Sequence, residues 1–272
     1  MPEVFGFDAY SPADIARRVE TVGEAKARMA LLPLAMLGML AGAFIGLGTL
    51  LFVLWRSDAS LGFAASVFGG GLVFSLGLLM VVVAGAELFT GNNLLVMAWA
   101  DGRIGTGLLL RNWAVVGLTN ALGAAAMAWL VLASGQHQLN GGAVGHQVVQ
   151  LALAKQELPF WTAFARGVLC NVLVCMAVWM ALAGRSVVDK AVAVVFPVVG
   201  FVAAGFEHSV ANLYLMPQAL WLQQSGVAAE GALLSWGGIA GNLLPVVLGN
   251  LVGGAGLVGL VYHVIYQRQP RP

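Results

Sequence analysis

Long runs of apolar residues without charges dominate the chain, and a run of about 20 such residues crosses the hydrocarbon core of a bilayer as one helix. Six segments are long and apolar enough, at 30–55, 61–100, 112–134, 160–184, 191–229 and 243–266; three of them carry a single charge, Glu87, Arg166 or Glu207. The second and fifth are nearly twice as long as one crossing needs. Only 9% of the residues are charged, against about 25% in soluble domains. The sequence therefore predicts an all-α integral membrane protein with six transmembrane helices.

The composition excludes several classes of protein. The formal net charge is only +1 and no cluster of lysines and arginines exceeds a pair, so the chain has no field that would hold nucleic acid. Cys170 and Cys175 lie five residues apart in one apolar run, which fits buried thiols and neither a zinc site nor a disulfide framework. We therefore predict no metal and no cofactor, and a lipid bilayer around most of the chain.

The positive charges are unevenly divided between the two sets of connections. Ten of the 13 lysines and arginines lie in the N-terminal region, the second and fourth connections and the tail, while Arg56, Lys155 and Arg166 form the other set. The positive-inside rule places the richer set, and with it both termini, in the cytoplasm. We divide the chain into a cytoplasmic N-terminal amphipathic helix (1–29), transmembrane repeat A (30–134), an extracytoplasmic loop (135–159), transmembrane repeat B (160–266) and a cytoplasmic tail (267–272).

The residues ahead of the first span carry the signals of a surface helix. Ser11 and Pro12 are typical of a helix N-cap and first turn, and an acid follows three residues after the serine. Ile15, Val19 and Val22 then recur at helical spacing and form an apolar stripe. This helix is either an anchor at the membrane surface or a lid over a pore mouth.

An internal repeat relates the two overlong segments. A shift of 120 residues superimposes the second segment on the fifth, and a shift of 130 superimposes the third on the sixth. The matched residues are Gly85, Glu87 and Asn92 with Gly205, Glu207 and Asn212, and Asn112 and Asn120 with Asn242 and Asn250. Because each unit contains three spans, an odd number, its two copies cross the bilayer in opposite senses. The sequence thus predicts an inverted 3+3 repeat.

The matched motifs also predict that the second and fifth helices are broken near the midplane. Irregular backbone at this depth is tolerated only where it is buried in protein or lines a cavity. Helix N-termini at the breaks would present free N–H groups and partial positive charge, which favour an anion. Glu87 and Glu207 are too costly to face lipid, and we expect them to accept hydrogen bonds from the unwound backbone or to handle an ion or proton.

His208 departs from this repeat, because its counterpart is Leu88. A symmetric scaffold does not need a histidine on one side only. We interpret His208 as a residue near the pore midpoint that pairs with an anion and passes it a proton. The alternative is a core histidine that is hydrogen-bonded to a neighbour such as Glu207. We expect Leu88, Glu207 and Asn212 to border the same pathway.

Four motifs give the chain a resemblance to the formate/nitrite transporter family. They read AELFTG at 86–91, CNVLVC at 170–175, GFEHSVAN at 205–212 and NLLPV at 242–246. The similarity covers residues 30–266. It implies an aquaporin-like protomer that assembles as a homopentamer with one pore per subunit, in a bacterial inner (plasma) membrane. The implied substrates are small monovalent anions.

The resemblance also implies roles for individual residues. His208 is similar to the family's central histidine, Thr90 to the loop threonine beside it, and Asn250 to the asparagine of the last span. Lys155 matches a lysine that draws anions to the pore mouth. The family's apolar constrictions resemble Phe74 and Phe201 on the outer side and Leu78, Phe89 and Val174 on the inner side.

These implied constrictions suggest a mechanism. A bare anion would have to shed its hydration to pass them, whereas the neutral acid would not, so we expect proton transfer from His208 to the anion. The motifs divide between nitrite and formate channels, and we predict nitrite with a slight preference over formate. A hydrosulfide, acetate or lactate channel of the same family and a non-transporting membrane anchor remain as alternatives. The paired loops of water channels and the twin histidines of ammonium transporters are absent from the sequence, which excludes those two kinds of channel. Hydrolase motifs are also absent, so we predict no enzyme.

Overall fold

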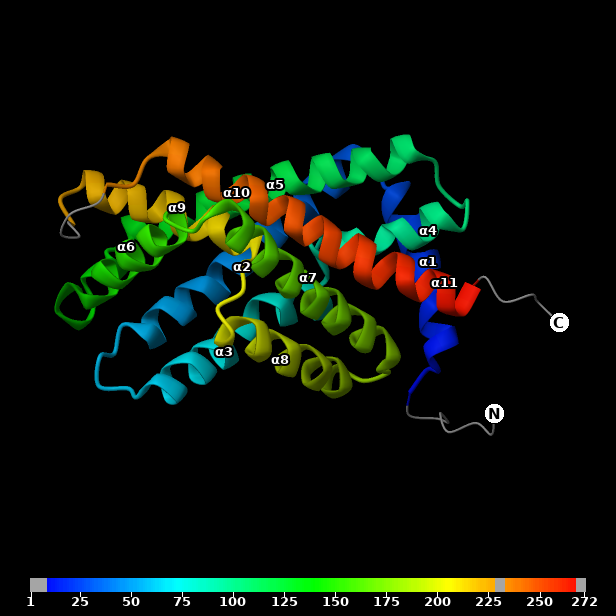
Figure 1. Cartoon of the computed structure of the whole chain (residues 1–272), viewed down its shortest axis with the longest axis horizontal. Helices are drawn as coiled ribbons and strands as arrows, with labels where there is room; N and C mark the ends of the chain where they lie inside the picture. Colours follow the sequence, from blue (N-terminus) through cyan, green and yellow to red (C-terminus); the bar gives the residue numbers. More distant parts are fainter. Residues whose placement is uncertain (1–8, 228–232, 268–272) are drawn as a thin grey trace.

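A computed structural model describes residues 9–227 and 233–267, and these are almost entirely helical (Figure 1). Five helices in these ranges are long and apolar enough to cross a membrane. They are Leu31–Arg56 (α2), Phe63–Gly85 (α3, Phe63–Met80, with a π-helical end, η1, Val81–Gly85), Thr106–Ala133 (α5), Phe160–Ala183 (α7) and Trp236–Tyr266 (α10, Trp236–Leu251, continued by η5, Val252–Leu260, and most of α11, Val261–Gln267). The chain is a multi-pass membrane protein.

The sequence predicts six spans, and the difference lies in the segment 191–229. This segment is divided into α8 (Val187–Ala203) and α9 (Ser209–Gln224), each of which is shorter than a membrane crossing. Gly205 adopts a φ of +70° in the gap between them, a conformation that stops a right-handed helix and suits glycine. The backbone itself, rather than any lack of apolar residues, keeps this segment from counting as a single span.

The segment 61–100 is interrupted in a similar way. The helical backbone of η1 ends at Gly85, whose φ is +89°, and residues 86–90 are not helical. A 3-10 turn, η2 (Gly91–Leu95), and a short helix, α4 (Val96–Ala100), follow. Residues 86–90 are buried, whereas Ala204 and Gly205 of the second interruption are exposed and line a cavity. Irregular backbone at membrane depth is tolerated in both of these settings.

Glycines allow the helices that flank the interruptions to approach closely. A Cβ atom on Gly42 of α2 would lie 2.1 Å from the Asn120 carbonyl oxygen of α5, and one on Gly249 of α10 would lie 2.3 Å from the Phe164 carbonyl oxygen of α7. Small residues at helix crossings are the usual means of close packing in membranes. The close approach brings side chains of α5 and α10 within hydrogen-bonding reach of backbone on α2 and α7.

The connection at 135–159, for which the sequence predicts an extracytoplasmic location, contains a helix that was not anticipated. After short 3-10 turns at Gln136–Gln138 and Asn140–Gly142, the helix α6 covers Ala143–Gln156. Its residues Val144, Val148 and Ala152 are fully or almost fully buried, in one apolar cluster with residues of α9. Four-residue spacing of these small apolar side chains gives α6 a face to bury, despite the polar residues between them.

The N-terminal helix α1 covers Pro12–Ala27 and begins at the N-cap Ser11, whose side chain accepts a hydrogen bond from the Asp14 N–H. Ile15 and Val19 of the predicted stripe are buried, whereas Val22 is 38% exposed. The buried face packs against η2, α4, α7 and η5, so α1 is part of the protein core at its end of the molecule. In Figure 1 this end, with α1, α4 and α11, lies opposite the end with α6. Of the predicted tail, 268–272 lie outside the described residues.

Candidate functional site

Each of the two interruptions carries a buried glutamate. Glu87 is 4% exposed and Glu207 is 2% exposed. Each carboxylate is paired with a lysine from another helix: Lys26 Nζ of α1 lies 3.0 Å from Glu87 Oε1, and Lys155 Nζ of α6 lies 2.7 Å from Glu207 Oε1. Pairing removes the main cost of burying either charge, and leaving one partner alone would be strongly destabilising.

Two asparagines complete the surroundings of each glutamate. Asn92 Nδ2 donates to Glu87 Oε2 at 2.7 Å and to Asn112 Oδ1 at 3.0 Å. The corresponding bonds in the other cluster run from Asn212 Nδ2 to Glu207 Oε2 at 2.7 Å and to Asn242 Oδ1 at 2.8 Å. Among the described residues neither carboxylate accepts a backbone N–H, so the expectation that they cap the unwound backbone is wrong. Their oxygens accept hydrogen bonds from lysine and asparagine side chains instead.

Asparagines from the neighbouring helices hold the unwound backbone. Asn120 Oδ1 accepts the Phe89 N–H at 2.9 Å, and its Nδ2 donates to the Glu87 carbonyl at 2.9 Å and the Gly38 carbonyl at 2.8 Å. In the other half, Asn250 accepts the Ser209 N–H at 3.1 Å and donates to the carbonyls of Glu207 at 3.1 Å and Gly167 at 2.8 Å. Both side chains are fully buried. The same three hydrogen bonds are therefore formed in each half.

His208 joins the two interruptions. It is the N-cap residue of α9, and its Nδ1 accepts the Ala211 N–H at 3.2 Å. Its Nε2 lies 3.1 Å from Thr90 Oγ1, on the other interruption. Since Nδ1 is an acceptor, the proton of the neutral ring is on Nε2, which donates to Thr90. The Thr90 hydroxyl hydrogen is then free to be donated elsewhere.

Aromatic rings surround this histidine. The Phe201 ring stacks on the imidazole with centroids 5.9 Å apart, and the Phe74 ring meets Phe201 edge to face at 5.8 Å. Both phenylalanines are buried. The other residues assigned to constrictions, Leu78, Phe89 and Val174, are buried as well, and so is Leu88, the counterpart of the histidine. All six belong to one apolar cluster. Two rings of this apolar cluster, those of Phe74 and Phe201, lie against the imidazole.

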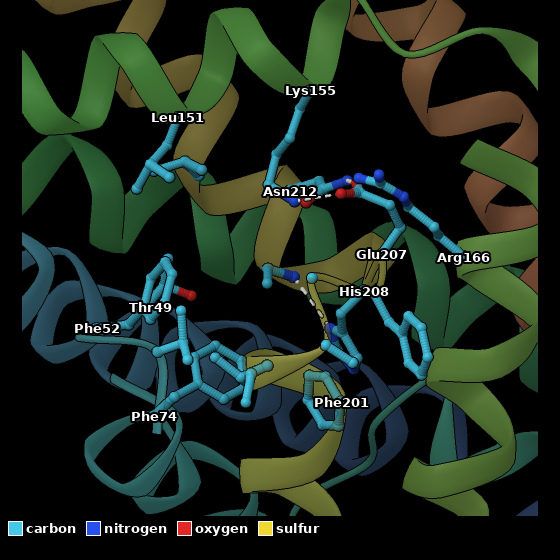
Figure 2. A pocket seen from close by; sticks show the side chains of 18 of the residues that line it. Thr49, Phe52, Phe74, Leu151, Lys155, Arg166, Phe201, Glu207, His208 and Asn212 are labelled. Carbon is cyan, nitrogen blue, oxygen red and sulfur yellow. Dashed lines mark hydrogen bonds and ion pairs between the residues drawn. The ribbon is translucent and has the colours of Figure 1, made fainter. Parts of the chain in front are cut away.

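A cavity of about 380 Å³ opens from the imidazole toward α6, and we call it the α6-side cavity. Phe74, Phe201 and His208 line its inner part, while Lys155 and Arg166 line it further out (Figure 2). Glu207 and Asn212 also contribute to the wall, as do Arg56 and Phe206. The ammonium group of Lys155 is bound to Glu207, so it does not stand in the cavity as a free charge.

Sequence reasoning missed Lys26 as part of the site and counted it only toward the cytoplasmic charge. Its counterpart Lys155 lies 129 residues further on, the spacing that also separates Gly38 from Gly167. A comparison of the halves at this third spacing would have found Lys26. Arg166 was noted only as a charge that a membrane helix must accommodate, and the structure adds its position on the cavity wall.

A second charged cluster lies at the α1 end. Glu20 of α1 is fully buried, with Arg103 Nη2 at 2.8 Å and His263 Nδ1 at 3.3 Å from its two oxygens. Burial, followed by the nearby Asp101 charge, raises the pKa of Glu20 above its usual value, although Arg103 and His263 act in the opposite direction. This carboxyl group ties α1 to the turn after α4 and to α11.

Comparison with known proteins matches the chain to the family described as formate/nitrite transporter, over residues 13–264. A formate channel of Escherichia coli (strain K12), FocA, is 39% identical over 97% of this chain and 96% of its own length. A protein called formate channel FocA in Haemophilus influenzae is 37% identical, with 93% of both chains covered.

Solved structures agree with these sequence matches. A structure described as a pentameric formate channel with formate bound superimposes with a TM-score of 0.81 at 37% identity, covering 88% of this chain and 98% of that one. A structure described as an ion channel of the FNT family has a TM-score of 0.83 at 29% identity, covering 94% of this chain and 99% of that one. Both similarities extend over almost the whole described chain.

Proposed function

The chain belongs to the formate/nitrite transporter family, and from this premise we propose that it is a channel for small monovalent anions whose pathway passes His208. The observation that carries the proposal is the hydrogen bond between His208 and Thr90. It joins the two interruptions at the inner end of the α6-side cavity. Two neighbouring hydrogen-bond donors, the imidazole and the threonine hydroxyl, in an apolar surrounding suit an anion that has given up part of its water.

The architecture behind this pathway is an inverted repeat of two three-span halves, in which the two interrupted segments each count as one crossing. The equivalent bonds of Asn120 and Asn250 support this relation, because each binds one N–H and one carbonyl of an interruption and one carbonyl of a flanking helix. So do the matching lysine–glutamate pairs. Six crossings, an even number, place both termini on the same side of the membrane, and the excess of lysine and arginine on that side makes it the cytoplasm.

The imidazole acts first as a hydrogen-bond donor. In the neutral ring the Nε2–H donates to Thr90, and the threonine hydroxyl is available to the anion. For proton transfer the ring must take a second proton from water at Nδ1, which means releasing the Ala211 N–H. The anion then takes the proton of Nε2, and the neutral acid crosses between Phe74 and Phe201. The neutral ring is left with its proton on Nδ1, and proton exchange with water returns the Nε2–H form that accepts the Ala211 N–H again. The proton is thus a partner of transport together with the anion.

Formate and nitrite are both planar anions with two oxygen atoms, and the site contains nothing that separates them. The relatives named above carry formate in their names, which favours formate. The motif-based preference for nitrite is therefore tested by direct competition of the two anions in one influx assay. Hydrosulfide, acetate and lactate serve as the further substrates of that assay.

The proposed assembly is a homopentamer in a bacterial inner (plasma) membrane. A pentameric structure among the neighbours supports the assembly. Exposed apolar residues of α2, α3 and α5 offer surfaces for lipid or for neighbouring subunits, among them Leu32, Phe68, Leu118 and Trp129. α1 acts as an anchor of the bundle or as a lid over the pore, since Lys26 reaches Glu87 from it.

Anion influx into liposomes tests the function. His208→Asn is the informative variant, because asparagine is a good N-cap and preserves the start of α9 while it removes the Nε2–H. We expect formate influx to fall by roughly 10²-fold, the scale of positioned proton-transfer groups, and to lose its dependence on pH. Leu118→Asn, on the exposed face of α5, is the matched control and should transport normally.

Two outcomes would contradict parts of this proposal. If the wild-type protein gives no influx of formate, nitrite or the further anions above empty liposomes, the chain is a non-transporting membrane anchor. If the His208 variant keeps both the wild-type rate and its pH dependence, proton transfer by His208 is wrong while the channel assignment survives.

A further inference from the structure

Three cations line the α6-side cavity, and they differ in what holds them. Lys155 is paired with Glu207, and the Arg56 guanidinium lies 5.9 Å from the centre of the Phe52 ring. The guanidinium of Arg166 has no hydrogen-bond or ion-pair partner among residues 9–227 and 233–267. The donors of Arg166 therefore remain available to a ligand, as do those of Arg56, whose ring contact engages none of its N–H groups.

The position of Arg166 within a membrane-spanning helix also carries a free-energy cost. It is the seventh residue of α7, a helix long and apolar enough to span the membrane. Ionisable residues inside such helices face the protein interior or a water-filled cavity, and they mark ion pathways. Figure 2 shows the Arg166 side chain extending along the cavity wall toward Lys155 and Glu207.

The scaffold does not need an arginine at this position. The backbone carbonyl of Arg166 accepts the Glu207 N–H at 3.3 Å, and in the other half the carbonyl of Leu37 accepts the Glu87 N–H at 3.2 Å. The same structural task is thus performed by backbone on both sides, with an arginine side chain on one and a leucine side chain on the other. His208 and its counterpart Leu88 differ in the same sense, and Arg166 and His208 line the same cavity.

We propose that Arg166 is an anion-binding residue that loads the pathway from the α6-side cavity. Its planar guanidinium binds the two oxygens of a small planar anion such as formate or nitrite as a fork, which a point charge cannot do. The anion then passes inward to the two phenylalanines and His208. This inference rests on the proposed anion channel, and it adds a preference for two-oxygen anions over single-centre anions such as hydrosulfide.

The test is the dependence of initial influx on anion concentration, measured in proteoliposomes for formate and for hydrosulfide. Arg166→Leu installs the residue of the other half, and we expect the half-saturating formate concentration to rise about tenfold, as for loss of one charged hydrogen-bonded contact. Arg166→Lys keeps the charge but not the fork. Compared with Arg166→Leu, this variant should return hydrosulfide influx to the wild-type value, while the half-saturating formate concentration stays as high as in Arg166→Leu.

Arg185→Gln is the control, because it removes an exposed arginine that lies outside this cavity, and we expect less than a twofold change. The inference is overturned if Arg166→Leu leaves the half-saturating formate concentration within twofold of wild type, if Arg185→Gln changes it as much, or if Arg166→Lys restores both anions equally. These results leave the channel assignment intact, since they require a wild-type protein that transports. A wild-type protein without influx overturns both proposals.

Discussion

The asparagines that hold the interrupted backbone permit a quantitative prediction, with Asn120→Leu as the perturbation. Leucine fills nearly the same volume but has no polar atoms, so three hydrogen bonds are lost. The Gly38 carbonyl lies inside α2 and keeps its place in a regular helix. The Phe89 N–H and the Glu87 carbonyl lie in the interruption, and no other hydrogen bond to them is found in the described part of the chain.

The magnitude follows from these two orphaned groups. Three side-chain bonds at the average value measured between membrane helices, about 0.6 kcal/mol each, would give a loss of about 2 kcal/mol. That average reflects partners that find other bonds after the change, which the two backbone groups here cannot do. A buried group left without a partner costs about 1–3 kcal/mol, so we expect a loss of about 4 kcal/mol in the free energy of unfolding.

The assay is equilibrium unfolding in mixed detergent micelles, with influx as a second readout. Asn250→Leu should cost the same as Asn120→Leu, because its three bonds are equivalent. Thr119→Val is the control in the same helix; the Thr119 hydroxyl donates to carbonyls of its own helix, so its loss should cost less than about 1 kcal/mol. A loss below about 1 kcal/mol for either asparagine variant would refute the reasoning.

Three further predictions concern the core and the α1 end. The raised pKa of Glu20 favours the protonated carboxyl group in the docked helix. Docking of α1 should therefore be strongest at pH values below the usual 4.5 and should weaken as the pH rises through the raised pKa. Hydrogen exchange of α1 measures this, and an equal dependence on pH in Glu20→Gln would contradict it. Gly123→Ala should lower stability by about 3 kcal/mol or more, because its Cβ would lie 1.9 Å from a backbone oxygen of α2, and Gly107→Ala, which meets open space, should not; equal unfolding curves would argue against the close packing. Cys170 and Cys175 are fully buried, so a maleimide should label them only after unfolding, and labelling in native micelles would show the core to be open.

Much of the polar framework is legible in the sequence, because the hydrogen-bonding asparagines recur at fixed spacings. Asn120 and Asn250 match at a shift of 130, and the glutamates match at 120. Lys26 escaped notice because the stretch between the first and second spans is nine residues longer in the first half, from Gly38 to Glu87, than in the second, from Gly167 to Glu207, so residues ahead of it match at 129 instead of 120. A pattern search at one spacing finds only the elements that lie between the same two insertions.

Other features could not be read from the pattern. Residues 135–159 contain glutamines, histidines and glycines that suggest a loop, yet Val144, Val148 and Ala152 fold them into α6 against α9. The kind of donor to the Glu87 carboxylate was also not predicted. Whether a buried carboxylate accepts a backbone N–H or pairs with a lysine depends on which helix end comes near, and here the lysines come from α1 and α6.

The two halves together indicate how the chain separates stability from transport. The glutamate charges of the interruptions are neutralised by a lysine in each half, so neither of these lysines is free to bind an anion. The residues that break the symmetry, His208 opposite Leu88 and Arg166 opposite Leu37, carry donors that the scaffold leaves unused or shares only with Thr90. A duplicated fold can change such positions without weakening its own support, because the bonds that hold the interruption come from backbone and asparagine. Selectivity for the anion is then expected to follow the asymmetric residues, and stability the symmetric ones.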